Sequence, residues 1–329
     1  MRIAACIAAI LIAVSASAEG IKVGMVKTSA GGAIFVAQEK GLFARAGCPA
    51  ELVFFDSAQP VAVAAVSGAI DFGVTGLTGG FYSLAGQGAL KIIAGSNQEA
   101  PGFQYLGHVV SNHAYEGGLK GFRDLPGHSF AMTQMGTTLV YALALVADKY
   151  GFDFKSLRMV ALQSNANVSS AIAGGQADAA VLPVTPAIAL VSRGDAKLLG
   201  WVGDETPGIQ ANVAFAAAKT AAERRDTVDC FLRAYKDGTR AFHDAFTGAH
   251  ESRADGPAAA ETVAILAKYT GERPDTVKLA IPYVDAESRL NIADLKRQIA
   301  WYKAQGFLKG EADGEAMIDR RTVVPLPPP

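Results

Sequence analysis

The sequence predicts an α/β protein of two lobes, each a mostly parallel sheet flanked by helices. Short apolar segments alternate with helical patterns that end at glycine, which is typical of repeated strand–helix units. The alternation occurs in two successive sets, over residues 21–95 and 103–202. Half of the 329 residues are hydrophobic and 19% are charged, which indicates a large buried core.

The strands and helices of the first set can be placed in order. They are strand 21–26, helix 33–45 interrupted at Gly41, strand 51–55, helix 59–67, strand 70–74, helix 79–85 and strand 90–94. Ser57 is the expected N-cap of helix 59–67, whose Pro60 lies in the first turn, where its missing N–H costs nothing.

The second set begins with a crossing strand over residues 103–110. It continues with strand 129–132, helix 138–150, strand 158–162, helix 168–173, strand 177–182, helix 185–192 and strand 197–202. The chain then returns through strand 213–217 and charged helices over 221–246, 258–269 and 293–304. Because no third strand-rich set follows, we expect this return to complete the first lobe.

The N-terminus has the pattern of a secretory signal peptide. Met1 and Arg2 precede an apolar stretch over residues 3–14, and small residues at 16–18 form a cleavage site. The apolar stretch is too short to span a bilayer. We therefore expect residues 1–18 to be removed and the mature chain to lie in the periplasm.

The expected domain boundaries follow from these patterns. Residues 19–107 begin lobe one, 108–204 form lobe two, and 205–324 return to lobe one with the C-terminal helices. The proline-rich residues 325–329 are expected to be disordered, because they suit neither helix nor sheet. The expected hinges are the crossing segments around residues 105–110 and 204–212.

Composition and motifs exclude several classes of function. Lys and Arg total 30 against 31 Asp and Glu, so no basic excess is present to bind nucleic acid. The sequence has none of the common hydrolase, zinc-protease, Walker or dinucleotide-binding motifs, and its five histidines lack metal-ligand spacing. We expect no catalysis, no metal and no cofactor. Cys48 and Cys230, which remain after signal cleavage, suit either one disulfide or two thiols.

Three segments resemble a known family when taken in order. They are residues 37–43 (AQEKGLF), 66–73 (VSGAIDFG) and 171–180 (AIAGGQADAA). Together they resemble the periplasmic solute-binding proteins of the nitrate/sulfonate/taurine type, which share their fold with thiamine-pyrimidine-synthase-like proteins. Residues 121–129 (GFRDLPGHS) are similar to the family's segment before the second lobe, with Pro126 and His128 as departures. The resemblance implies the two-lobe type II fold, and these glycine turns are interpreted as structural.

A ligand in such a fold is expected outside the carboxyl ends of the strands. The loops there are small and polar in both lobes. In lobe one the candidate ligand-binding residues are Thr28, Ser29, Gly31, Gly32, Ser57, Thr75, Gly76, Thr78, Ser96 and Asn97. In lobe two they are Gly136, Thr137, Thr138, Asn165, Val184 and Thr185.

The turn from Gly136 to Thr138 is the most specific of these features. Exposed amides, two hydroxyls and a helix N-terminus suit one carboxylate or sulfonate group. Ordinary N-capping also favours Thr at this position, so the two interpretations stay open. The neutral loops favour a small monoanion or a neutral heterocycle.

The expected function is that of an exported receptor that captures a small organic solute by hinge closure and delivers it to an inner-membrane ABC permease. Sulfonate, taurine-like, aromatic-acid and pyrimidine-precursor ligands all fit, and we expect a monomer. The alternatives are a thiamine-pyrimidine-synthase-like enzyme, whose family carries a cysteine-rich motif that this chain lacks, and a binding subunit for a sensor.

Overall fold

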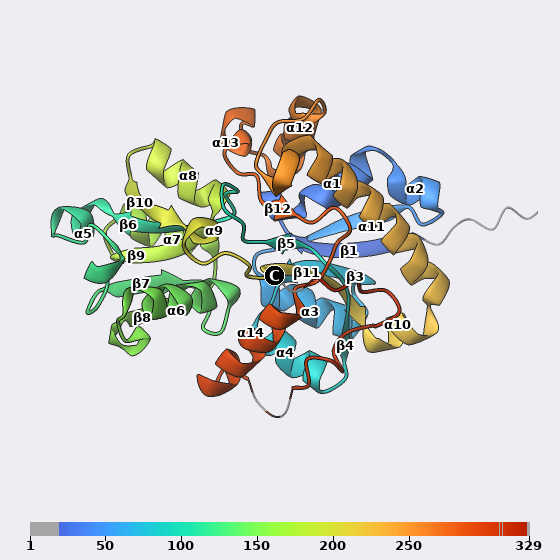
Figure 1. Ribbon diagram of the computed structural model, residues 1–329, viewed down its shortest axis with the longest axis horizontal. Coiled ribbons are helices and arrows are strands. Elements are labelled where there is room, and N and C mark those ends of the chain that lie inside the picture. Colours follow the sequence, from blue (N-terminus) through green and yellow to red (C-terminus); the bar gives the residue numbers. More distant parts are fainter. Residues whose placement is uncertain (1–19, 309, 311, 328–329) are drawn as a thin grey trace, which may run out of the picture.

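The computed structural model describes residues 20–308, 310 and 312–327. Two sheets lie side by side, each covered by helices (Figure 1). We call each sheet with its helices a lobe. The expected signal peptide, residues 1–18, lies outside the described residues.

Sheet one takes its strands from the two ends of the chain. It consists of β1 (Ile21–Val26), β2 (Ala50–Phe55), β3 (Phe72–Gly76), β4 (Leu90–Gly95) and β11 (Asn212–Ala217), in the order β2-β1-β3-β11-β4. β1 pairs in parallel with β2 and β3, whereas β11 is antiparallel to β3 and β4.

Sheet two repeats this topology with the middle of the chain. It consists of β6 (Leu106–Ser111), β7 (Ser129–Met132), β8 (Arg158–Ala161), β9 (Ala179–Pro183) and β10 (Ala196–Trp201), in the order β10-β6-β9-β7-β8. β7 is parallel to β8 and β9, and β6 is antiparallel to β9 and β10. Each sheet therefore has one antiparallel strand, the one that the chain enters after crossing from the other lobe.

The helices fill the connections between these strands. Those up to β10 are η1 (Ser29–Gly31), α1 (Gly32–Glu39), α2 (Leu42–Ala46), α3 (Ala58–Ser67), α4 (Gly79–Gly86), α5 (Asn112–Glu116), η2 (Phe122–Asp124), α6 (Thr138–Tyr150), η3 (Phe154–Ser156), α7 (Asn165–Ala173) and α8 (Val184–Ser192). The later ones are α9 (Val202–Glu205), α10 (Ala218–Glu223), α11 (Arg225–Phe246), η4 (Ala249–Glu251), α12 (Ala259–Thr270), α13 (Pro274–Lys278) and α14 (Ile292–Ala304). The single helix expected over 221–246 is divided at Arg224, whose ψ of 51° is not helical.

Residues 96–105 and 202–211 connect the lobes as two antiparallel segments. The Glu99 amide donates to the Ile209 carbonyl over 2.9 Å, and the Gly208 amide donates to the Glu99 carbonyl over 2.8 Å. The first segment contains β5 (Asn97–Gln98), which pairs with β12 (Tyr283–Val284). The hinge expected at 105–110 is therefore misplaced, because residues 106–111 form β6 with a neighbour on each side, and the crossing lies before them.

The glycine turns of the family motifs have a structural role in both lobes. The Asp71 carboxylate accepts a hydrogen bond from the Lys22 amide of β1, and the Asp178 carboxylate accepts one from the Ser129 amide of β7, both over 2.8 Å. Asp71 lies just before β3 and fastens it to β1, and Asp178 lies just before β9 and fastens it to β7. Asp71 also pairs with Arg224 at the break between α10 and α11.

The C-terminal tail corrects an expectation. The Leu290 amide donates to the Val324 carbonyl over 2.9 Å, and the Leu326 amide donates to the Leu290 carbonyl over 2.8 Å. The disorder expected for 325–329 is therefore wrong for Pro325 and Leu326, because Leu326 supplies the N–H that its proline neighbours lack. Pro328 and Pro329 lie outside the described residues.

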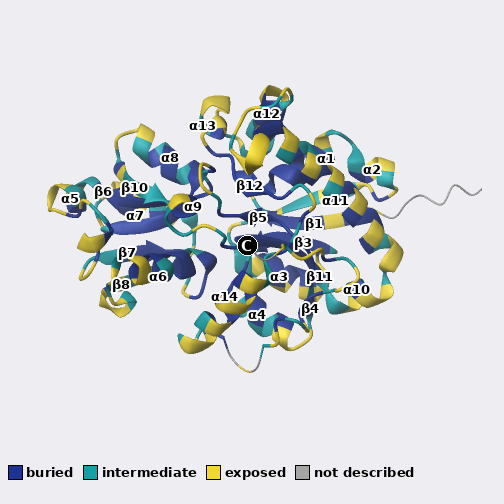
Figure 2. Ribbon diagram, in the orientation of Figure 1, coloured by how far each residue is buried: buried dark blue, intermediate teal, exposed yellow. Residues whose placement is uncertain are grey.

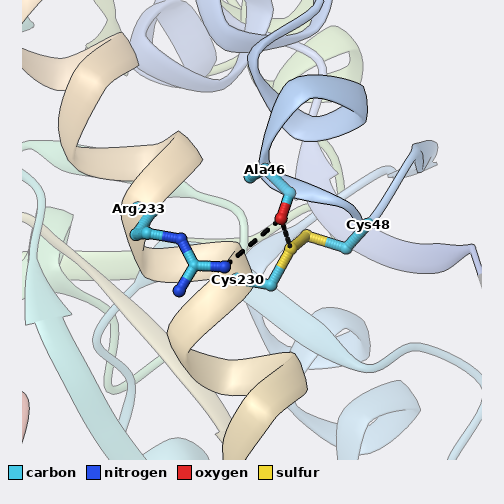
Figure 3. Close-up of a disulfide and its surroundings, with 4 residues drawn as sticks. All are labelled: Ala46, Cys48, Cys230 and Arg233. Carbon is cyan, nitrogen blue, oxygen red and sulfur yellow. Dashed lines mark hydrogen bonds between the residues drawn. A yellow bond between two sulfur atoms is a disulfide. The ribbon is translucent and has the colours of Figure 1, made fainter. Parts of the chain in front are cut away.

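Cys48 and Cys230 form a disulfide, which decides between the two alternatives left open by the sequence (Figure 3). Cys48 follows α2, and Cys230 lies in the first half of α11, with their Cα atoms 6.2 Å apart. The Arg233 guanidinium donates to the nearby Ala46 carbonyl over 3.2 Å. The disulfide joins the start of lobe one to the segment that returns to it.

Burial follows the layers (Figure 2). The central strands of both sheets are buried, whereas the outer faces of the helices are exposed. None of the helices in the described part of the chain has the length and hydropathy needed to cross a membrane.

Candidate functional site

A cleft of about 750 Å³, including its solvent-open part, lies between the two lobes. Lobe one lines it with residues at the carboxyl ends of β1, β2 and β3, and lobe two lines it from β7, β8 and β9. The lining residues are Val26, Thr28, Ala30, Gly31, Ser57, Ala58, Val74, Thr75, Gly76, Leu77, Thr78, Tyr105, Leu106, Thr133, Gln134, Thr137, Thr138, Leu139, Asn165, Pro183, Ala211 and Asn212. This is the sheet edge at which the sequence predicts a ligand.

The lining is polar without being charged. It contains no Asp, Glu, Lys, Arg or His side chain from the described residues, but it includes seven Ser and Thr hydroxyls. Of the two cations near these loops in sequence, Lys27 is outside the lining, and Arg193 pairs with Asp195 over 2.7 Å. A ligand in this cleft is therefore recognised by directed hydrogen bonds and helix termini rather than by ion pairs.

Four α-helices that begin at the cleft have a Ser or Thr N-cap, and these caps differ. Thr78 caps α4 by accepting from the Phe81 amide, and Ser164 caps α7 by accepting from the Asn167 amide. Ser57 before α3 and Thr137 before α6 make no such bond. Ordinary capping thus explains Thr78 and Ser164 but does not explain Ser57 or Thr137. Asn165 is the first residue of α7 and not its cap.

Thr137 is the hydroxyl with the clearest capacity for a ligand. Its Oγ1 atom is buried without a hydrogen-bond partner among the described residues, and the side chain is 6% exposed. The first bond within α6 runs from the Val140 amide to the Thr137 carbonyl, so the amides of Thr138 and Leu139 precede it. A buried hydroxyl at the N-terminus of a helix suits one anionic or strongly polar ligand atom.

The neighbouring Thr138 has a different role. Its Oγ1 donates to the Leu77 carbonyl of lobe one over 2.7 Å. The Gly79 amide likewise donates to the Gly136 carbonyl over 2.8 Å. These hydrogen bonds join the N-terminal end of α6 to the loop before α4 and close one side of the cleft.

The structure brings together nine of the sixteen residues predicted to bind ligand. They are Thr28, Gly31, Ser57, Thr75, Gly76, Thr78, Thr137, Thr138 and Asn165. Each lies at the carboxyl end of a strand or in the loop that follows it. Ligand contact at these positions stays a prediction.

Four of the others lie outside the lining and within the packing of lobe one or the crossing segment. Ser29 is buried in η1, and a Cβ on Gly32 would lie 2.3 Å from the Phe242 ring, so α11 covers that face. Ser96 and Asn97 are buried in the first crossing segment, where the Ser96 hydroxyl donates to Asn97 Oδ1 over 3.2 Å. They miss the cleft because the chain leaves β4 directly for lobe two.

The remaining three lie outside the lining on the lobe-two side. Gly136 packs against Phe307 and accepts from Gly79, so it belongs to the contact between the lobes. Val184 and Thr185 are buried at the start of α8, where Val184 packs with Ala280. Pro183 alone of that turn reaches the cleft.

Several lining residues were not predicted. The Tyr105 hydroxyl donates to Asn212 Oδ1 over 3.1 Å, so the last residue of the first crossing segment contacts the first residue of β11, which directly follows the second. Burial raises the pKa of Tyr105, which keeps its hydroxyl protonated as a donor. Thr133 and Gln134 follow β7 directly, and this position after a strand was the available signal.

The described residues show no cluster of side chains suited to binding a metal ion. No group of three or more His, Cys, Asp or Glu side chains there could hold an ion. The cleft residues offer neutral oxygens and amides instead.

Comparisons with known proteins agree with this architecture. A family model described as "NMT1/THI5 like" matches residues 30–245. No curated protein is a significant match. Among solved structures, the alkanesulfonate-binding protein SsuA from Xanthomonas axonopodis pv. citri bound to MOPS has a TM-score of 0.73 at 20% identity, covering 92% of this chain and 99% of that chain.

Two further structures are similar over most of their length. The periplasmic aliphatic sulphonate binding protein SsuA from Escherichia coli has a TM-score of 0.70 at 18% identity, covering 92% of this chain and 98% of that one. The periplasmic nitrate-binding protein NrtA from Synechocystis PCC 6803 has a TM-score of 0.71 at 15% identity, covering 91% and 84%. These likenesses confirm the expected fold.

Proposed function

The chain belongs to the NMT1/THI5-like family, and we propose that it is an exported solute receptor of an ABC importer. It binds a small organic anion or heterocycle between its lobes and delivers it unchanged to an inner-membrane permease. The observation that carries the proposal is the uncharged cleft, lined from both lobes by hydroxyls and helix N-termini. A ligand that contacts both sets of loops stabilises the closed arrangement.

The ligand is a monoanion or a neutral polar molecule. Desolvating a multiply charged ligand in a cleft without cations is costly, because no opposite charge offsets the lost hydration. A single sulfonate or carboxylate is favoured by the Thr137 hydroxyl and by the dipole of α6, which contributes up to about 2 kcal/mol. The sulfonate- and nitrate-binding descriptions of the similar proteins support an oxyanion group.

Export to the periplasm completes the proposal. The N-terminal pattern of residues 1–18 fits a signal peptide, and the disulfide between Cys48 and Cys230 requires an oxidising compartment to form and persist. The similar SsuA and NrtA proteins are described as periplasmic, which supports the same location.

A thermal-shift panel tests this function. The purified mature chain is heated with an aliphatic sulfonate, taurine, an aromatic acid or a pyrimidine precursor, each over a range of concentrations. A true ligand raises Tm with concentration, because it binds only the folded state. For an acidic hit, the matched control is its neutral amide, which should give a smaller shift. If no member of the panel raises Tm, the proposed ligand classes are wrong.

A further inference from the structure

Helix α14 contacts both lobes outside the cleft. In Figure 1 it lies between α4 of lobe one and α6 of lobe two. The ring of Tyr302 on α14 has its centroid 5.4 Å from that of Tyr82 on α4 and 6.4 Å from that of Tyr141 on α6. One buried aromatic row therefore runs from lobe one to lobe two through α14.

The chain after α14 fixes this helix to lobe one. The Ile92 amide of β4 donates to the Met317 carbonyl, and the Asp319 amide donates to the Ile92 carbonyl, both over 2.9 Å. Within lobe one, the Tyr82 hydroxyl donates to Gln298 Oε1 on α14 over 3.1 Å. Any polar contact from α14 to α6 is consequently a contact between the lobes.

Asp294 on α14 makes that contact. Its side chain is 0% exposed, and Oδ1 accepts from the Tyr141 hydroxyl of α6 over 3.1 Å and from Arg297 over 3.1 Å. Oδ2 accepts from the Gln210 amide over 2.7 Å and from Gln298 over 2.8 Å. One buried carboxylate thus joins α14, the second crossing segment and lobe two.

The position of Tyr141 gives this contact its consequence. Tyr141 lies one turn after Thr137, and its amide donates to the Thr137 carbonyl over 3.0 Å. The turn of α6 that presents Thr137 to the cleft is therefore the turn that Asp294 holds from the other side. Moving α6 away from lobe one would leave a buried carboxylate without one of its donors, which is costly.

We propose that Asp294 is a positioning residue that holds α6 against lobe one in the ligand-free protein, through its hydrogen bond from Tyr141. The contact keeps the N-terminus of α6 facing lobe one before any solute arrives. Loss of the Tyr141 hydroxyl shifts the ratio of closed to open protein by about fivefold toward open, the usual effect of one hydrogen bond. This inference concerns the ligand-free arrangement, so it is independent of which solute binds.

The test is small-angle X-ray scattering of the ligand-free mature chain, with Tyr141→Phe, Asp294→Asn and the control Tyr82→Phe. The control also removes one buried tyrosine hydroxyl that bonds to α14, but that bond lies within lobe one. A merely structural role would lower Tm in both tyrosine variants without changing the radius of gyration. Asp294→Asn provides a second reading if Tyr141→Phe does not fold cooperatively.

The expected result is a larger radius of gyration for Tyr141→Phe and Asp294→Asn than for wild type, with Tyr82→Phe equal to wild type. The inference is overturned if the folded Tyr141→Phe and Asp294→Asn variants keep the wild-type radius. It is equally overturned if Tyr82→Phe expands as much as they do. Since no ligand is added, failure here leaves solute capture untouched, and failure of the thermal-shift panel leaves this result standing.

Discussion

The Thr138 hydroxyl donates to the Leu77 carbonyl across the cleft, whereas the hydroxyl of the adjacent Thr137 is buried without a partner among the described residues. Two threonines in sequence thus have opposite roles. The Thr138 hydroxyl bonds the two lobes to each other, whereas the Thr137 hydroxyl can still form a hydrogen bond to a ligand.

Thr137→Val should therefore weaken binding without weakening the fold. Valine keeps the shape and removes a buried hydroxyl that has no internal bond to lose, so the free energy of unfolding should stay level or rise slightly. Affinity for a hit from the panel should fall tenfold or more, measured by calorimetry. Thr138→Val should instead lower the free energy of unfolding by about 1 kcal/mol. Unchanged affinity in Thr137→Val would remove Thr137 from the site.

Gly76→Ala should narrow the cleft at low cost to stability. A Cβ there would lie 3.6 Å from the Ala211 carbonyl and 3.7 Å from Thr138 Oγ1, which is ordinary contact facing the cleft. At Gly31 the same Cβ would lie 2.7 Å from the Phe35 ring, so Gly31→Ala should also disturb the core. We expect Gly76→Ala to keep the wild-type Tm and bind more weakly, and Gly31→Ala to lose Tm. Full affinity in Gly76→Ala would show that the ligand does not reach this strand end.

Reduction of the disulfide should destabilise lobe one without altering recognition. Cys48 and Cys230 are 182 residues apart in sequence, so the bond restricts the unfolded chain strongly. Reductant should lower the free energy of unfolding in urea by about 2–5 kcal/mol. The double variant Cys48→Ser with Cys230→Ser should have this lower free energy of unfolding without reductant, and reductant should not change it. Because neither cysteine lines the cleft, a large change in ligand affinity would contradict the proposed site.

His108 should make the fold less stable in acid. It is 1% exposed on β6, and both ring nitrogens are without hydrogen-bond partners among the described residues. Burial lowers the pKa of His108 from 6.5 to about 4, with Glu205 opposing the shift. Between these values the unfolded chain binds a proton that the folded protein does not, so stability falls as pH drops from about 6.5 to 4.

The loss attributable to His108 is about 3 kcal/mol over that range. Urea unfolding of wild type and His108→Leu at pH 7 and pH 4.5 measures it. Leucine does not titrate, so the variant should lose less stability than wild type between the two values. An equal loss in both proteins would show that other groups set the acid response.

The sequence predicted local structure closely where local signals are strong. β1, β7 and α6 have the expected bounds, because an apolar strand between polar residues and a helix ended by Gly151 are specified locally. The first hinge was misplaced because an apolar segment gives no sign of whether it crosses between lobes or joins a sheet. Only pairing with β9 and β10 assigns residues 106–111 to lobe two.

The candidate site was predicted in part for the same reason. Strand ends identified Thr75 and Thr137, whose loops face the other lobe. The same rule placed Ser96 and Thr185 at the cleft, but the crossing after β4 and the packing of α8 take them elsewhere. Tyr105 and Asn212 are 107 residues apart in sequence, so no local sequence pattern predicts their contact. Thr137 is distinguished from an ordinary N-cap only by the absence of a hydrogen bond from a helix amide to its side chain, which the sequence does not reveal.

The central claim is that the cleft holds one small solute and releases it intact. The most direct measurement incubates the mature chain with the strongest hit of the thermal-shift panel, determines stoichiometry by calorimetry, and weighs the solute recovered after denaturation by mass spectrometry. The account predicts one solute per chain, lost in parallel with affinity in Thr137→Val, and recovered at its original mass. A recovered compound of altered mass, or wild-type binding in Thr137→Val, would contradict it.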